Sequence, residues 1–168
     1  SAPTPRIGGV AIAVGILSGA LLSGYDNFGL LLWTTLPIFL VGLLEDLGPD
    51  TSPSLRLGIA SFSSILAIVM FNTTIDRISL PPIDPVFSLP LFAAGFTIFA
   101  CAGFTHAINL IDGLNGLSSA IVIFIMASFA LVAYRFDHPD LLTLNLVVIA
   151  AFCSFMVLNF PFGRIFLG

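Results

Sequence analysis

Six long apolar segments dominate this chain and limit what it can fold into. Each has roughly the length that a helix needs to cross a bilayer, about 20 residues. The backbone must satisfy its own hydrogen bonds inside lipid, and the segments lack the alternation of barrel strands, so helices are expected. The sequence therefore predicts an all-α polytopic membrane protein with about six transmembrane helices. The segments are 7–23, 29–44, 57–72, 88–108, 118–134 and 142–158, of which the second and third are short enough to be tilted or partly broken.

The composition agrees with a lipid environment and excludes one class of partner. The chain is 58% hydrophobic and 8% charged, whereas a soluble domain carries roughly 25% charged residues. It has no lysine and a net charge of −4, which argues against nucleic-acid binding. Cys101 and Cys153 both lie in apolar segments and are predicted to be buried small hydrophobic residues, with neither a disulfide nor a zinc site.

The connections between the segments fall into two sets. If the chain crosses the membrane at each apolar segment, alternate connections lie on the same face of the membrane. We treat residues 1–168 as a single transmembrane domain. One face carries Arg6, Arg56 and Arg164, and the other carries Arg77 and Arg135, which favours a cytoplasmic location for the first. On the other face, prolines 81, 82 and 85 predict that 73–87 is extended. The connections that share the first face are 1–9, 45–56, 109–117 and 159–168.

Two adjacent acids, Glu45 and Asp46, follow the second apolar segment. They repel each other and lie unfavourably at the negative end of the helix dipole. A divalent cation or a cationic partner such as Arg56 would relieve that repulsion, and ligands with oxygen donors alone suit Mg²⁺. A pair of acids solvated by water is the alternative interpretation.

The segment 109–117 places polar residues and glycines directly between two apolar segments. Asn109 and Asp112 are three positions apart and would share one helix face. Gly113 and Gly116 permit the close backbone approach that a phosphate-contacting turn needs. Polar groups at that depth are costly unless they face protein, water or an ion. We therefore predict a functional turn there, while His106 is interpreted as a packing residue.

Two further segments could contact substrate. Residues 1–9 are held extended by two prolines and offer Arg6, whose planar guanidinium suits phosphate. Asn159 begins a polar segment that reaches Arg164. The alternatives are a simple juxtamembrane linker for the first and a helix stop for the second.

Four of these fragments, taken in order, resemble one family. The chain resembles the polyprenyl-phosphate N-acetylhexosamine-1-phosphate transferases, the glycosyltransferase 4 family of bacterial envelope synthesis. The resemblance extends over the whole chain, but family members have more membrane helices than six, so we expect this chain to be the central part of a longer protein. The fragments are Pro-Thr-Pro-Arg-Ile-Gly-Gly at 3–9, Gly-Leu-Leu-Glu-Asp at 42–46, Asn-Leu-Ile-Asp-Gly-Leu-Asn-Gly-Leu at 109–117, and Asn-Phe-Pro at 159–161 with Ile-Phe-Leu-Gly at 165–168.

The resemblance implies transfer of a sugar phosphate at the membrane surface. The donor would be a UDP-N-acetylhexosamine, the acceptor undecaprenyl phosphate or a similar lipid, and the released product UMP. The cofactor would be Mg²⁺ or Mn²⁺. Two mechanisms are open to the family, direct attack by the lipid phosphate and an enzyme-bound intermediate, and we favour direct attack. Such a protein lies in the bacterial inner membrane with its active face toward the cytoplasm, and a homodimer is left open.

Roles are carried over to the matching positions only. The resemblance implies catalytic roles for Glu45, Asp46 and Asp112, and metal binding by Asp46, Asn109 and Asp112. Substrate binding, by resemblance or by the residue chemistry above, is expected of Arg6, Arg56, Asn109, Gly113, Asn115, Gly116 and Asn159.

The chain departs from the family pattern at several positions. Glu45 replaces an aspartate, Pro49 stands where some members carry lysine, and Asn115 replaces a later acid. The family has a metal-binding aspartate directly after the position of Gly168, so this piece alone is expected to be inactive. The motifs favour the O-antigen, enterobacterial-antigen and exopolysaccharide initiators over the peptidoglycan branch. Other hypotheses are a transporter with a broken-helix site, a CDP-alcohol phosphotransferase and a structural membrane subunit.

Overall fold

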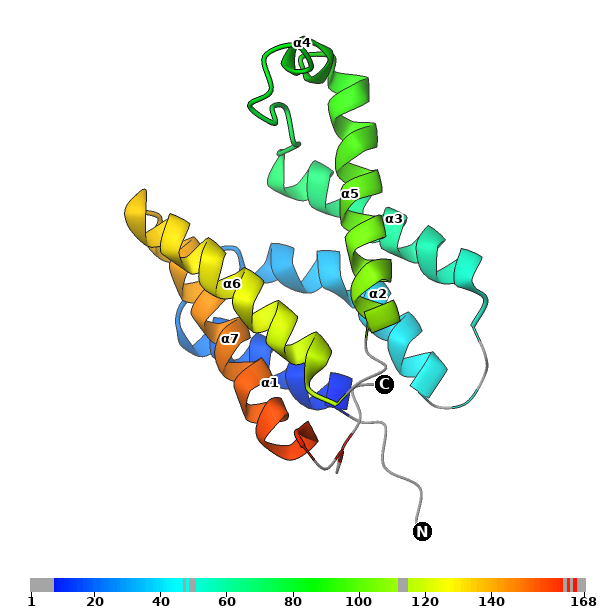
Figure 1. Cartoon of the computed structure of the whole chain (residues 1–168), viewed down its shortest axis with the longest axis vertical. Helices are drawn as coiled ribbons and strands as arrows, with labels where there is room; N and C mark the ends of the chain where they lie inside the picture. Colours follow the sequence, from blue (N-terminus) through cyan, green and yellow to red (C-terminus); the bar gives the residue numbers. More distant parts are fainter. Residues whose placement is uncertain are drawn as a thin grey trace. The chain divides into compact units, whose positions relative to one another are not determined.

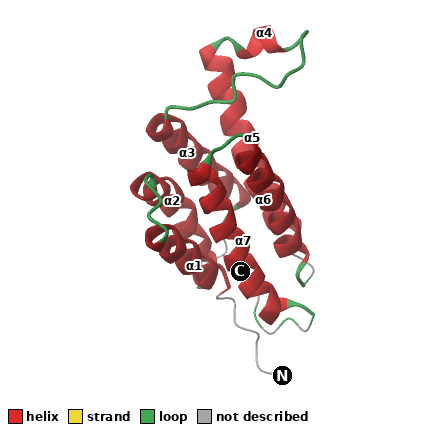
Figure 2. Cartoon of the chain, turned by 90° about the vertical axis from the view of Figure 1, so that its left-hand side faces the viewer, coloured by secondary structure: helices red, strands yellow, loops and turns green. Residues whose placement is uncertain are grey.

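A computed structural model describes residues 8–46, 48, 51–111, 115–161, 163 and 165. Within these ranges every regular element is a helix and no strand occurs (Figure 2). Five helices are long and apolar enough to cross a membrane, and α1 is a shorter apolar helix of 15 residues. The all-α, multi-pass fold class is therefore confirmed. In chain order the helices are α1 (Gly8–Leu22), α2 (Phe28–Asp46), α3 (Pro53–Phe71), α4 (Asp84–Phe87), α5 (Pro90–Ile111), α6 (Leu117–Arg135) and α7 (Pro139–Asn159) (Figure 1).

The second and third apolar segments form continuous helices of 19 residues each, so of the two possibilities raised for them, a tilted or a partly broken helix, the broken one is not found. The start of α3 is fixed by Ser52, whose Oγ accepts a hydrogen bond of 3.3 Å from the N–H of Leu55. Proline follows at the first helical position, where its missing N–H costs nothing. The preceding helix, α2, continues at its C-terminal end through Glu45 and Asp46. The acidic pair therefore belongs to a helix and not to a loop.

The connection between α3 and α5 contains a short helix, α4, which the prolines did not predict. Pro85 lies in the first turn of α4, a position that tolerates proline because the first helical N–H groups have no intrahelical partner. The prediction of a wholly extended connection is therefore wrong for 84–87.

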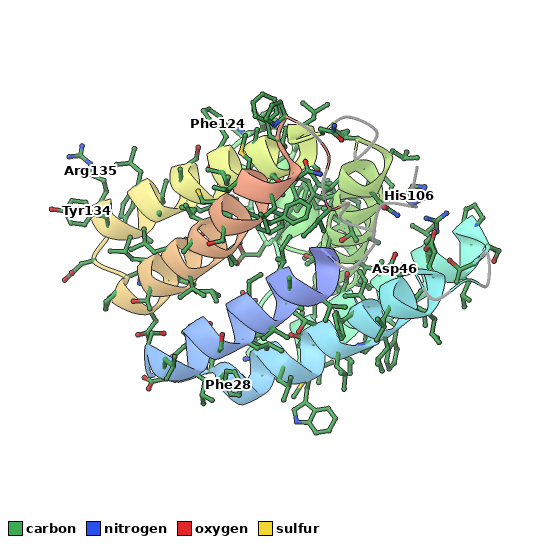
Figure 3. All side chains as sticks on the ribbon, turned by 90° about the horizontal axis from the view of Figure 1, so that it is seen from below. Phe28, Asp46, His106, Phe124, Tyr134 and Arg135 are labelled. Atoms are coloured by element: carbon green, nitrogen blue, oxygen red, sulfur yellow. The ribbon has the colours of Figure 1, made fainter. Side chains whose placement is uncertain are left out.

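The outer faces of the helices are apolar. Phe99 and Phe124 are each 75% exposed, and Figure 3 shows Phe124 projecting outward from α6. Cys101 and Cys153 are exposed as well, so the prediction that they are buried is wrong. Apolar residues turn outward in this way where lipid is the solvent, because the outward face then gains nothing from being polar.

The chain divides into two compact units. Unit 1 comprises Ser1–Phe28, Gly42–Pro49 and Ile108–Gly168, and unit 2 comprises Gly29–Val41 and Asp50–Ala107. Unit 1 thus combines α1, α6 and α7 with the last turns of α2 and α5.

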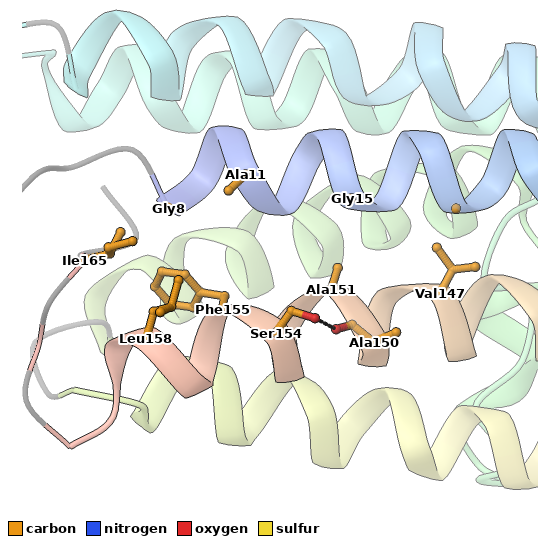
Figure 4. Close-up of a pocket in the computed structure, with 11 residues that line it drawn as sticks. Gly8, Ala11, Gly15, Val147, Ala150, Ala151, Ser154, Phe155, Leu158 and Ile165 are labelled. Atoms are coloured by element: carbon orange, nitrogen blue, oxygen red, sulfur yellow. Dashed lines mark hydrogen bonds between the residues drawn. The ribbon is translucent and has the colours of Figure 1, made fainter.

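Within unit 1, α1 and α7 pack closely through small residues. A Cβ built on Gly15 would lie 3.4 Å from the Cβ of Ala151, and one built on Gly19 would lie 2.7 Å from a methyl group of Val147. Because the position on α1 rises as the position on α7 falls, the two helices are antiparallel (Figure 4). Glycine permits this approach, since a side chain at either position would separate the helix backbones.

The antiparallel packing brings the start of α1 to the end of α7. Gly8 and Leu158 line the same groove between these helices. At the other end, burial raises the pKa of the Tyr25 hydroxyl, and the Asp140 carboxylate in the first turn of α7 acts in the same direction. The ends of α1 are thus matched to the opposite ends of α7.

Replacing Gly19 by alanine tests this packing. The new Cβ would meet the stiff, β-branched side chain of Val147, so we expect a loss of about 1–2 kcal/mol, the cost of overpacking less the gain in helix propensity. Gly15→Ala is the matched control, because its Cβ would make only ordinary contact, and it should be neutral or stabilising. Unfolding midpoints in detergent measure both, and equal effects of the two variants would contradict the register.

Candidate functional site

The end of α7 and the start of α6 are joined by a buried asparagine. Asn159 is 5% exposed. Its Oδ1 accepts a hydrogen bond of 2.5 Å from the N–H of Gly116, and its Nδ2 donates one of 2.8 Å to the carbonyl of Ile165. Because Gly116 is the residue that precedes α6, one side chain connects two of the predicted motif segments.

A second set of contacts reinforces this connection. The Nδ2 of Asn115 donates to the carbonyl of Pro161 at 3.3 Å, and the N–H of Gly163 donates to the carbonyl of Asn159 at 2.7 Å. Gly116 and Gly163 both adopt positive φ, +80° and +58°, which glycine accepts without strain. We call Asn115, Gly116, Asn159, Pro161, Gly163 and Ile165 the Asn159 clasp.

Gly163→Ala should weaken the clasp. The substituted residue would be strained at φ +58°, and its Cβ would lie 2.8 Å from the Nδ2 of Asn115, so we expect a loss of about 2 kcal/mol. Gly24→Ala is the control. Gly24 has φ +69° and a Cβ built on it would meet nothing within 4 Å, so this substitution measures the backbone strain alone. Thermal unfolding of both variants measures the difference, and a smaller loss at Gly163 than at Gly24 would contradict the contact with Asn115.

Several helix ends that carry predicted residues belong to unit 1 together with the clasp. The groove beside α1 reaches from Gly8 to Ile165 of the clasp. Unit 1 also contains the last turn of α2, with Glu45 and Asp46, and the last turn of α5, with Asn109. Figure 3 has Asp46 on the side of the picture where α6 begins, and Tyr134 and Arg135 on the side where α6 ends. Unit 1 therefore contains the clasp together with the helix ends that carry Glu45, Asp46 and Asn109.

The acidic pair lies at a helix end whose dipole favours a cation. Glu45 and Asp46 are half-buried in the last turn of α2, where the helix dipole disfavours negative charge. The N–H of Gly48 closes this helix end by donating to the carbonyl of Glu45 at 3.2 Å. Two carboxylates fit Mg²⁺, which binds through one or two carboxylates and keeps water and phosphate oxygens as its other ligands.

The described residues contain no group of three His, Cys, Asp or Glu side chains that could hold a metal by itself. The amide of Asn109, which is exposed at the end of α5, adds an oxygen donor in the same unit. The oxygen chemistry of these donors therefore fits a magnesium ion.

The structure does not place the remaining predicted residues with this group. Arg6, Asp112, Gly113 and Arg164 are outside the described residues. Arg56 belongs to unit 2, where it is half-buried in the first turn of α3. The roles of all these residues in substrate or metal binding remain predictions.

Two buried serines at the start of α6 were not predicted. Ser118 and Ser119 are 2% and 0% exposed, and the Oγ of Ser119 has no hydrogen-bond partner within the part of the chain that is described. The sequence feature that could have indicated them is a pair of hydroxyl residues directly after the 109–117 segment. They pack the beginning of α6 tightly behind the Gly116 turn.

The chain matches one protein family and several curated relatives. The family model described as "Glycosyl transferase family 4" matches residues 28–168. A protein of Bacillus subtilis (strain 168), named a "probable undecaprenyl-phosphate N-acetylglucosaminyl 1-phosphate transferase", is 33% identical over 98% of this chain and 46% of its own length. No solved structure matches.

Relatives with a different name also match. A phospho-N-acetylmuramoyl-pentapeptide-transferase of Streptococcus pneumoniae (strain CGSP14) is 26% identical over 99% of this chain and 55% of its own length. One of Clostridium botulinum (strain Alaska E43 / Type E3) is 23% identical over 98% of this chain and 54% of its own length. The chain thus spans about half the length of the curated relatives it matches.

Proposed function

We propose, from the premise that this chain belongs to the glycosyl transferase family 4, that its parent protein transfers an N-acetylhexosamine-1-phosphate from a UDP-sugar to a polyprenyl phosphate. The observation that carries the proposal is the family match over 28–168, a range that includes Glu45, Asp46, Asn109 and the clasp. Unit 1, where the ends of α2 and α5 accompany the clasp, supports a common site at one end of the helices.

The reaction follows from the two substrates. An oxygen of the lipid phosphate attacks the sugar-bearing phosphorus of the UDP-sugar, and the bond from that phosphorus to the bridging oxygen breaks. The electron pair leaves with UMP, and the lipid keeps a diphosphate linked to the sugar. A magnesium ion, held by Asp46, Asn109 and Asp112, would offset the repulsion between the two anionic substrates.

The protein residues then have distinct tasks. Asp46 accepts the proton of the lipid phosphate or binds the metal, and Glu45 adds negative charge beside it. Arg6 and Arg56 offer guanidinium groups to phosphate oxygens. The Asn159 clasp holds Asn115 and Gly116 in place directly before α6.

The relatives favour one branch of the family. The N-acetylglucosaminyl relative is more similar to this chain than the two muramoyl-pentapeptide relatives named above, which supports UDP-N-acetylglucosamine as donor and undecaprenyl phosphate as acceptor. A transporter with 109–116 as a broken-helix site would place acids near the bilayer midplane. It gains no support from the acidic pair, which lies in the last turn of α2.

The test is an assay of the full-length protein for UMP release from UDP-N-acetylglucosamine and undecaprenyl phosphate. We expect activity that EDTA removes and that added Mg²⁺ or Mn²⁺ restores. UDP-glucose, which lacks the acetamido group, is the control donor and should support less turnover. Absence of UMP release with every UDP-N-acetylhexosamine would overturn the function, and activity insensitive to EDTA would overturn the metal.

A further inference from the structure

The second part of the connection between α3 and α5, residues 78–89, has a largely apolar outer surface. Its exposed large side chains are Leu80, Ile83, Val86 and Leu89, each 41–59% exposed. The prolines at 81, 82 and 85 are exposed among them. A connection that faces water normally presents polar side chains, so we ask what covers the segment 78–89.

The one charged side chain of this segment is turned inward to the backbone. Asp84 is half-buried, and its Oδ1 accepts hydrogen bonds from the N–H groups of Ile78 and Leu80 at 3.0 and 3.3 Å. The carboxylate therefore satisfies two backbone donors that would otherwise need water. The outer surface retains no charge of its own.

The rest of the backbone also satisfies itself to an unusual degree. Three of the residues are prolines without an N–H. Four further N–H groups donate within the segment, at 2.8–3.2 Å, from Ile83, Asp84, Val86 and Leu89. A segment with so few unsatisfied donors loses little when it leaves water, which is the condition that lipid imposes on a backbone.

An aromatic cluster holds the segment in place. Phe87 is 2% exposed and makes edge-to-face contacts with Phe92 and Phe96 of α5, with ring centroids 5.1 and 4.9 Å apart. The N–H of Ile75 donates to the Oγ1 of Thr97 at 2.8 Å. These contacts fix α4 beyond the first turn of α5 (Figure 1), so its exposed side chains cannot turn inward.

We propose that segment 78–89 lies within the membrane interface, with Leu80, Ile83, Val86 and Leu89 directed toward the acyl chains of one leaflet. The occupant is lipid because the segment lies in the connection between two helices, α3 and α5, that are each long and apolar enough to cross the membrane, and it leads directly into α5. It therefore begins and ends at the bilayer surface, and its apolar face continues the outer faces of α3 and α5. Amphipathic segments bind membranes by inserting such a face below the headgroups. The proposal is independent of the transferase function.

Spin labels can test this placement. Single cysteines at Ile83 and Leu89 would carry a nitroxide in the full-length protein, with its own cysteines replaced, in phosphatidylcholine vesicles. Asp76, exposed in the same connection, is the matched water control, and Phe99 of α5 is the lipid control. Collision with oxygen, which partitions into lipid, is compared with collision with a water-soluble nickel complex.

We expect labels at 83 and 89 to collide more with oxygen than with nickel, as at 99, and the label at 76 to show the reverse. Nickel accessibility at 83 and 89 equal to that at 76 would overturn the proposal in favour of a water-exposed loop. Low accessibility to both reagents would overturn it in favour of a protein cover from elsewhere in the full-length chain.

Discussion

Asp46→Asn in the full-length protein is expected to lower the rate of UMP release at least about 100-fold, the scale of losing one preorganised electrostatic contact to the transition state. The substitution keeps the size of the side chain and removes the charge that would bind metal or accept the proton. The measurement is kcat with saturating UDP-sugar at several Mg²⁺ concentrations. A higher Mg²⁺ requirement in the variant would indicate metal binding, and a lower kcat at every Mg²⁺ concentration would indicate proton transfer.

Asp76→Asn is the control for this substitution. Asp76 is exposed in the connection between α3 and α5 and has no predicted role, so its variant should retain the wild-type rate. Because both changes remove one carboxylate, a general effect of net charge would lower both rates alike. Full activity of Asp46→Asn would contradict the role of the acidic pair.

Asn159→Leu is expected to produce the second large effect. Leucine has a similar size but cannot hydrogen-bond to the N–H of Gly116 or to the carbonyl of Ile165. In the described contacts these two groups are joined only through Asn159. Leaving two such groups without partners costs about 2–4 kcal/mol at roughly 1–3 kcal/mol each, reduced because Ile165 is half-exposed. The unfolding midpoint in detergent should fall accordingly, and kcat should fall more than the midpoint alone explains.

The same helix offers a matched control for this variant. Among the described contacts, Asn145 of α7 donates to the carbonyl of Leu141, one turn away, at 2.7 Å. Asn145→Leu removes an equal side chain without separating two segments, so its midpoint and kcat should stay close to wild type. If both leucine variants behaved alike, the clasp would have no special role.

The membrane-spanning helices could be predicted from the sequence because lipid constrains each one separately. A segment in lipid must be apolar along its length and must close its hydrogen bonds within itself, and both properties are local. All six predicted segments correspond to helices. The ends were less predictable, because a cap such as Ser52 lengthens α3 by one turn and α4 forms with a proline in its first turn.

The residues of the site could be selected from the sequence, but their contacts could not. Asn159 was predicted to bind substrate, and in the structure its amide bonds to two backbone groups. One of these belongs to a residue 43 positions away. No local pattern indicates such a partner, since it depends on how α6 and α7 pack. The positive φ of Gly163 and its contact with Asn115 are likewise consequences of that packing.

The sequence by itself determined that this chain is a set of membrane helices and which polar segments interrupt them, because apolar length and the cost of polar groups in lipid are properties of single segments. Only the tertiary structure decided which helix ends meet. The glycines of α1 set its antiparallel register against α7, and Asn159 ties the end of α7 to the start of α6. These contacts join residues far apart in the sequence, and so they follow from packing between helices and not from the pattern within any one of them.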